Sequence, residues 1–272
     1  MVYNGIMSEP ILPTDPHTNQ TAAQTTNEHI EEYVEEWGDE SEGDQVLYDL
    51  SDTSIEVPDY WRQLPTLPPK QRVKLALSHI ADSLAEVMPR TVARLEEACE
   101  DVLPARMYGK PVLVYQIVAD LEEDDDDMKE YNFYEGGLPI GHTLSEVDSQ
   151  PPLLVPADLV ASWAAAPHQL RQFYEHVHNG FTTMNGVYGP LPLQEWGRYI
   201  DTDWLSDEEK TLPEATAYYT TDDDGNSTGL ILDGNLKGQG VSFVHDDDEQ
   251  FAQVDFWQEL DQYMATMITG EE

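Results

Sequence analysis

Residues 69–102 read PKQRVKLALSHIADSLAEVMPRTVARLEEACEDV, and this segment sets the helical part of the architecture. Pro89 interrupts an otherwise regular pattern, so we expect either a kinked helix or two helices, with Pro89 near the start of the second. The apolar residues recur at steps of three and four, which places them on one helical face that we expect to pack against a core. This face consists of Val73, Leu77, Ile80, Leu84, Val87, Thr91, Leu95, Ala98 and Val102.

Strand signals follow this helical segment. Residues 111–119, PVLVYQIVA, are rich in β-forming residues and predict a buried strand, and Tyr131–Tyr134 predicts a shorter one. A helical signal returns at Leu170–Val177 and is followed by short β-type runs at Ala217–Thr220, Thr228–Leu232 and Val241–His245. Helices, then clustered strands, then a closing helix predict an α+β fold with an antiparallel or mixed sheet flanked by helices.

The closing helix has a recognisable start. Asp255 is a good N-cap residue, and Gln258 follows it three positions later, which is the outline of a capping box. We expect Phe256 and Trp257 to be largely buried on this helix, against Phe173.

Residues 1–56 are polar, and no Lys or Arg precedes Arg62. Such a segment cannot bury enough apolar surface to offset its ordering entropy, so we expect a disordered acidic N-terminal tail. Ile30, Tyr33, Val34 and Trp37 form a helical stripe that could dock on a partner or on the chain's own body, but a transient helix in a solvated tail is the preferred interpretation. We expect one folded unit over residues 57–270, made of a helical and strand elaboration at 57–150 and a further region at 151–270.

The charge balance is extreme: 54 acidic residues stand against 13 basic ones, for a formal net charge of -41. A field of this sign repels nucleic acid and anionic membranes and attracts cationic partners. A basic partner, adaptation to high salt and an acidic tail are the competing explanations. The tail alone is insufficient, because the segment expected to fold is acidic too.

The chain lacks the common signatures of catalysis and metal binding. It contains neither a P-loop nor a GxGxxG pattern, and its lone Cys99 falls within the helical segment as a small packed residue. His176 and His178 are two apart and so do not make a metal pair on a helix. Asp224 begins a partial EF-hand pattern, which is better interpreted as a tight turn because Asn235 occupies the position that needs a bidentate Glu. We therefore expect no enzyme activity, no cofactor and no metal.

Compartment signals point to the cytoplasm. A single cysteine cannot form an internal disulfide, which fits a reducing environment. No apolar run is long enough to span a bilayer. The amino terminus has no basic region followed by an apolar run, so we expect no secretory signal.

Three acidic clusters occur in predicted loops. A single charged run is usually a solvated loop, but three on one folded unit cost stability unless a cation or a basic partner neutralises them. We take these clusters as the candidate partner-binding residues: Glu122, Glu123, Asp124, Asp125, Asp126, Asp127, Asp222, Asp223, Asp224, Asp246, Asp247, Asp248 and Glu249. The cluster at Asp246 is favoured because it shortly precedes the closing helix.

Four short segments carry a family resemblance by their order and spacing. They are a helix leading to an Asn-Gly turn (Leu170–Tyr174 and His178–Gly180), a Gly/Pro-containing segment (Tyr188–Leu193), a strand with a Leu-Asp step (Gly229–Asp233) and a closing helix (Val254–Met264). In this order they resemble the SUKH superfamily, the group built around the yeast Smi/Knr cell-wall regulator. The resemblance covers about residues 153–267, and neither residues 57–140 nor the acidic tail belong to it.

The resemblance implies a SUKH-like, non-catalytic binding protein. Many bacterial members of the superfamily are immunity proteins that bind and block a cognate toxin, often a nuclease or deaminase, and eukaryotic members are regulatory interaction proteins. Because enzymes acting on nucleic acid tend to be basic, an acidic immunity protein could cover their substrate surface. The alternative is a regulatory scaffold whose acidity reflects halophilic adaptation. The residues expected to be structural are Asn179, Gly180, Asp233, Asp255, Phe256 and Trp257.

Overall fold

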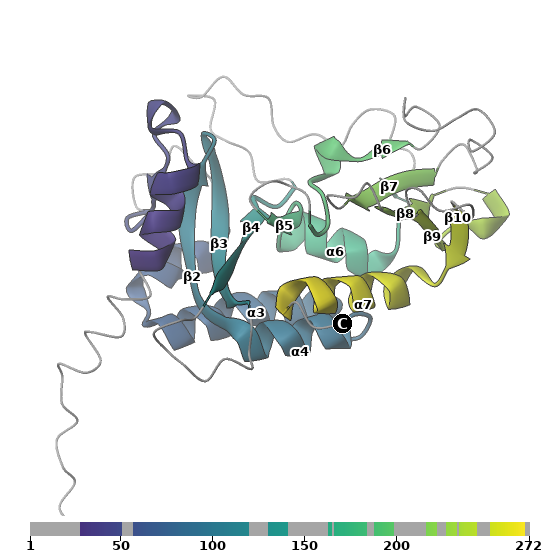
Figure 1. Ribbon diagram of the computed structural model, residues 1–272, viewed down its shortest axis with the longest axis horizontal. Helices are drawn as coiled ribbons and strands as arrows, with labels where there is room; N and C mark the ends of the chain where they lie inside the picture. Colours follow the sequence, from purple (N-terminus) through teal and green to yellow (C-terminus); the bar gives the residue numbers. More distant parts are fainter. Residues whose placement is uncertain are drawn as a thin grey trace, which may run out of the picture.

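The computed structural model describes residues 28–50, 57–119, 130–140, 163–164, 166–183, 188–198, 216–221, 227–232, 234–243 and 251–269. Their fold is α+β, and its two sheets are antiparallel throughout, in agreement with the predicted class. The sheets lie side by side, with helices beneath and between them (Figure 1).

The first sheet has the strand order β1-β2-β3-β4-β5. Its centre is the hairpin of β2 and β3, whose turn at Tyr108 and Gly109 has positive φ at both residues. Positive φ at both central residues is typical of a two-residue type I′ turn, which matches the twist of the flanking strands. The strands are β1 (Gln45–Val46), β2 (Cys99–Met107), β3 (Lys110–Val118), β4 (Tyr131–Gly137) and β5 (Phe181–Thr183).

The second sheet has the order β10-β9-β8-β7-β6. Gly240 in β9 lies against the start of the closing helix, where an added Cβ would come within 2.8 Å of the Phe256 Cα. The strands are β6 (Gly197–Arg198), β7 (Thr216–Thr221), β8 (Ser227–Ile231), β9 (Gly240–Phe243) and β10 (Phe251–Val254).

Helices pack on both faces of the first sheet. Alternate side chains of β3 point to opposite faces, so Leu113, Tyr115 and Ile117 join the large core, while Val112 and Val114 join a smaller one. The large core runs from Val57 to Ile268 and lies under the main helices, which are α2 (Asp59–Gln63), α3 (Pro69–Leu84), α4 (Pro89–Ala98), α6 (His168–His176) and α7 (Phe256–Thr269). Short 3-10 turns lie at Glu40–Glu42, Leu64–Thr66, Leu193–Glu195 and Gly234–Leu236.

The predicted helical segment divides at Pro89 into two helices, α3 and α4, each with proline in its first turn. The apolar pattern nevertheless placed the C-terminal end of the second helix too late in the sequence. The helix stops at Ala98, and Cys99 opens β2 instead of lying within a helix. Residues 99–107 form a strand that is mostly buried on both faces. Apolar residues occur on both faces of such a strand, so Val102 fits the helical spacing by coincidence.

The expectation of a disordered tail over residues 1–56 is wrong for residues 28–50. Residues 28–37 form a helix, here called the N-terminal helix, which packs on the outer face of β2 and β3 (purple in Figure 1). Ile30, Tyr33 and Val34 are at most 5% exposed there. The segment is polar overall, but the sheet supplies the apolar surface that it lacks, and this burial favours the docked helix over the transient one.

The closing helix α7 starts as its sequence predicts: the Gln258 N–H donates to Asp255 Oδ1 at 2.9 Å. Phe256 is buried, at 2% exposed, whereas Trp257 is only half-buried and packs at the edge of the core. The expectation of a largely buried Trp257 is therefore wrong. It sits one position round the helix from Phe256 and so faces away from the core centre.

A second cap joins α7 to α4. The N-cap residue of α4, Met88, makes no side-chain cap bond. Asp261 of α7 takes its place: its Oδ1 accepts the Thr91 N–H at 2.8 Å and the Thr91 hydroxyl at 2.9 Å, and its Oδ2 accepts the Arg90 N–H at 3.2 Å. A buried carboxylate from the far end of the chain thus satisfies donors that the first turn of α4 leaves unpaired.

Candidate functional site

The acidic clusters Glu122–Asp127, Asp222–Asp224 and Asp246–Glu249 lie outside the described residues, as does Asp233. Their assignment to partner binding therefore stays a prediction from sequence. The described residues form another candidate binding site and several clusters of buried polar side chains.

The Asn179-Gly180 turn ties three elements together. Asn179 Oδ1 accepts the Leu193 N–H at 2.9 Å, and Asn179 Nδ2 donates to Gln194 Oε1 at 2.9 Å. Gly180 has φ of +88° and lies against Pro192, where an added Cβ would come within 2.6 Å of the Pro192 nitrogen. The turn has the left-handed geometry expected of Asn-Gly, and it serves to hold the 3-10 turn at Leu193.

His178, next to this turn, is fully buried. Its Nε2 lies 2.6 Å from the Tyr115 hydroxyl, and its Nδ1 lies 3.3 Å from the Gly137 carbonyl oxygen. These partners fit the neutral tautomer in which Nδ1–H donates to Gly137 and Nε2 accepts from Tyr115. Burial lowers the pKa of His178 from 6.5 to about 3, so the ring is uncharged at neutral pH. His176, by contrast, is exposed, so these two side chains do not form a pair.

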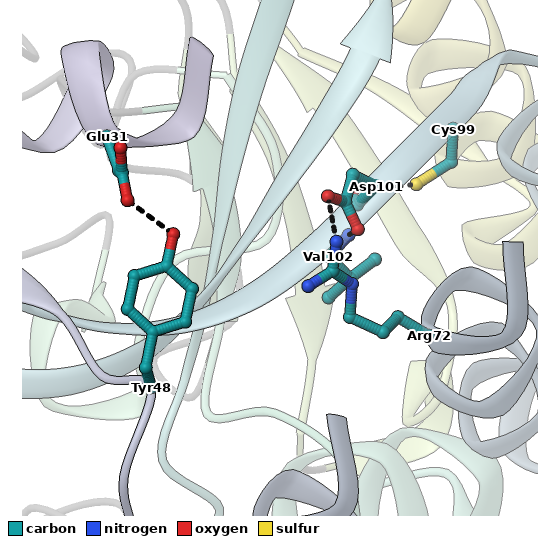
Figure 2. Close-up of polar contacts among 6 residues, drawn as sticks. All are labelled: Glu31, Tyr48, Arg72, Cys99, Asp101 and Val102. Carbon is teal, nitrogen blue, oxygen red and sulfur yellow. Dashed lines mark hydrogen bonds and ion pairs between the residues drawn. The ribbon is translucent and has the colours of Figure 1, made fainter. Parts of the chain in front are cut away.

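A buried ion pair joins α3 to β2. Arg72 Nη2 and Asp101 Oδ2 are 2.5 Å apart, and the two side chains are 3% and 0% exposed (Figure 2). Burial raises the pKa of the Asp101 carboxyl, and the Arg72 charge opposes that rise. The Cys99 thiol donates to the Asp101 carbonyl oxygen at 3.6 Å, and burial raises its pKa, which leaves it protonated. A protonated, buried thiol packs as an apolar group and is a poor nucleophile.

The strongest candidate binding site is a groove of about 480 Å³ between the N-terminal helix and the edge of the first sheet. We call it the aromatic–acidic groove. The helix lines it with His29, Glu32, Tyr33, Glu36 and Trp37. The sheet edge and the segment after β5 line it with Tyr131, Asn132, Phe133, Thr183 and Tyr188.

Helical spacing explains why these side chains gather. Residues 29, 32, 33, 36 and 37 recur at steps of three and four, so they lie along one side of the N-terminal helix. Tyr33 belongs to both the groove and the small core, and its ring stacks on Phe133 with centroids 4.4 Å apart. The His29 ring lies 4.9 Å from that of Tyr131. The helix thus sets its groove-facing rings directly against those of β4.

Hydrogen bonds to carboxylates outside the groove lining fix the Tyr33 and Tyr131 rings. The Tyr33 hydroxyl donates to Glu135 Oε1 at 2.7 Å, and the Tyr131 hydroxyl donates to Glu100 Oε2 at 3.1 Å. Burial raises the pKa of both Tyr33 and Glu135, and the Tyr33 bond opposes the rise at Glu135. Glu32 and Trp37, at the mouth of the groove, remain exposed.

A larger groove, of about 1080 Å³, runs along α3. Lys70 and Lys74 line it together with Glu96 and Glu100, so it presents charges of both signs. Its floor is apolar, with Val73 and Leu77 among the lining residues. This mixture does not select a partner by charge, in contrast to the aromatic–acidic groove, which has no Lys or Arg among its described lining residues.

Within the described part of the chain, no group of three or more His, Cys, Asp or Glu side chains is placed to hold a metal ion. No helix among the same residues is long and apolar enough to cross a bilayer. No protein-family profile, curated protein or solved structure matches the chain.

The aromatic–acidic groove was not predicted from the sequence. The sequence shows the stripe at Ile30, Tyr33, Val34 and Trp37, and Glu32 and Glu36 lie beside it at helical spacing. That local pattern indicates the helical wall of the groove. The other wall comes from residues about 100 to 150 positions further along the chain, and no local pattern connects it to the helix.

Proposed function

We propose that this chain is a non-enzymatic inhibitor that binds and neutralises a basic protein, in the manner of a SUKH-like immunity protein acting on a cognate toxin. The observation that carries the proposal is the excess of 54 acidic over 13 basic residues. A surface of that sign attracts a basic partner and repels nucleic acid, the expected substrate of a nuclease or deaminase.

The aromatic–acidic groove supports a binding role. Interfaces concentrate their energy in aromatic and Arg residues that sit in well-packed pockets. A groove with rings on both walls and carboxylates at its mouth offers such a pocket to a basic partner. The resemblance to the SUKH superfamily supports the inhibitor class independently of the charge.

The proposal predicts a toxin gene beside the gene for this chain, and the product of that neighbouring gene is the protein with which it is tested. Co-expression should protect cells from that toxin, and purified chain should form a stable complex with it and block its activity. The absence of both protection and a complex would leave the regulatory scaffold as the better account.

The contribution of the sequence-predicted loop is measured separately. Changing Asp246, Asp247 and Asp248 to Asn should slow association with the toxin on the order of tenfold at low salt and flatten its salt dependence, because steering scales with local charge. The matched control changes three exposed acids elsewhere, Glu28, Glu35 and Glu86, to Gln. Equal slowing by both variants would mean that net charge, and not this loop, steers the encounter.

A further inference from the structure

We infer that the aromatic–acidic groove binds an arginine side chain presented by the basic partner. This inference rests on the proposed function and names the chemistry by which one site would recognise the partner. Three features of the groove carry it: its charge, its rings and its fixed geometry.

The charge of the groove selects a cation. Glu32 and Glu36 lie one helical turn apart on the same side of the N-terminal helix, and no Lys or Arg is among the lining residues that the structure describes. His29 Nδ1 lies 3.8 Å from Glu32 Oε2, so Glu36 is the carboxylate without this neighbour. Phosphate and other anions would meet these two carboxylates and the field of a chain with net charge -41. A positively charged group meets complementary charge at the mouth.

The rings favour arginine over lysine. The Trp37 side chain is 41% exposed at the rim and is the ring whose face is open to a cation. Tyr33 and Phe133, whose centroids are 4.4 Å apart, and Tyr131 beside His29 form the aromatic wall next to it. A cation over an aromatic face is attracted by the ring quadrupole, with Trp the strongest partner. The guanidinium group is planar and weakly hydrated and can also engage a carboxylate with two N–H groups, whereas an ammonium is a strongly hydrated point charge.

The groove is set before the partner arrives. Tyr33 and Tyr131 are each held by a hydrogen bond to a carboxylate outside the groove, so binding does not have to order them. Its volume of about 480 Å³ also falls within the range of pockets that hold ligands larger than one side chain. The expected occupant is therefore an arginine together with its flanking backbone, in an exposed segment of a partner protein.

The probe for a direct test is the peptide acetyl-Gly-Arg-Gly-amide. It is titrated into the isotope-labelled full chain while the six Trp indole N–H signals are followed by NMR, with the Trp37 signal assigned from Trp37→Phe. We expect the Trp37 signal to shift and saturate. The same peptide with citrulline, which keeps the shape and loses the charge, should produce no saturable shift at Trp37.

Paired variants separate the groove from the general field. Glu32→Gln with Glu36→Gln should weaken peptide binding about threefold or more, as expected for the loss of two exposed ion pairs. Glu28→Gln with Glu35→Gln removes the same charge from exposed positions of the same helix outside the groove lining and should change binding less than about 1.5-fold, given the screening of distant exposed charges. Trp37→Ala should weaken binding about two- to fivefold, the equivalent of an exposed cation–π contact. Unchanged circular dichroism would show that each variant is folded.

Three results would overturn the inference. Equal shifts with the citrulline peptide would mean that the groove does not recognise the positive charge. Equal affinity for a lysine peptide would contradict the preference for arginine. Equal weakening by the two Glu pairs would mean that the groove is not the site.

The outcome is independent of the toxin experiment. A groove that binds arginine in a chain that gives no protection would contradict the immunity role alone. A chain that protects, with a complex unaffected by changes at Glu32, Glu36 and Trp37, would contradict the groove alone.

Discussion

At the scale of single residues, the fold depends on polar side chains held in dry surroundings. His178 is the clearest case, because its ring is accommodated uncharged between the Tyr115 hydroxyl and the Gly137 carbonyl. Gly136 makes this possible, since a Cβ there would lie 2.6 Å from the imidazole. A charged imidazolium at this site would have no counter-ion among the groups that bond it.

Acid should therefore weaken the fold through His178. Its pKa is lowered from 6.5 to about 3 in the folded state, so the unfolded chain binds the proton more readily. The neutral His178 ring contributes fully to the free energy of unfolding above pH 6.5, and this contribution is lost as the pH falls toward 3. Each pKa unit between the folded and unfolded states corresponds to about 1.4 kcal/mol. Urea unfolding at several pH values measures it. Carboxylate protonation acts in parallel, so the comparison is with His178→Gln, whose stability should vary less steeply between pH 6.5 and 3. Identical slopes would contradict the assignment.

Asp261 should matter more than an ordinary helix residue. Asp261→Ala removes the cap of α4 and leaves the buried Thr91 N–H and hydroxyl without this acceptor, which we expect to cost about 2–4 kcal/mol. Asp261→Asn keeps one acceptor oxygen and should cost less. Chemical denaturation of both variants gives the free energies of unfolding. An alanine variant within about 0.5 kcal/mol of the parent chain would mean that water replaces the cap without loss.

At the scale of elements, the N-terminal helix is part of the folded body. Ile30 is fully buried against the sheet, so Ile30→Ala should cost about 2–4 kcal/mol of unfolding free energy, the usual range for such a truncation. Glu35→Ala, on the exposed side of the same helix, should change it by less than about 0.5 kcal/mol. Limited proteolysis should spare residues 28–37. Rapid cleavage inside that range, or a silent Ile30→Ala, would contradict the docking.

Elements also show where sequence reasoning succeeds. The helices at α3, α4, α6 and α7 and the strands β3, β4, β7, β8 and β9 were predictable because each carries a local apolar pattern or cap. The short strands β1, β5 and β6 were missed, since two or three residues cannot display a period. β2 was missed because its residues include acids and a proline, and because Val102 continues the helical spacing of α4. For the aromatic–acidic groove, only the wall formed by the N-terminal helix corresponds to a local sequence pattern.

At the scale of the whole molecule, like charges dominate. With a net charge of -41, self-repulsion opposes the compact state, and dissolved salt screens it over a length of about 10 Å at 0.1 M. Melting temperature should therefore rise with sodium chloride over the first few hundred millimolar and then level off. Differential scanning calorimetry across that range is the measurement. A chain that folds only in molar salt would instead favour adaptation to a saline habitat.

The contact between Asp261 and Thr91 has a consequence for biosynthesis. The two residues are 170 positions apart, so a ribosome adding about 5–20 residues per second completes α4 roughly 10–30 seconds before its cap emerges. During that interval the apolar side of α4 has no α7 to cover it. The nascent chain therefore carries an incomplete core until α7 emerges and docks, and such exposed apolar surface is the kind that chaperones bind.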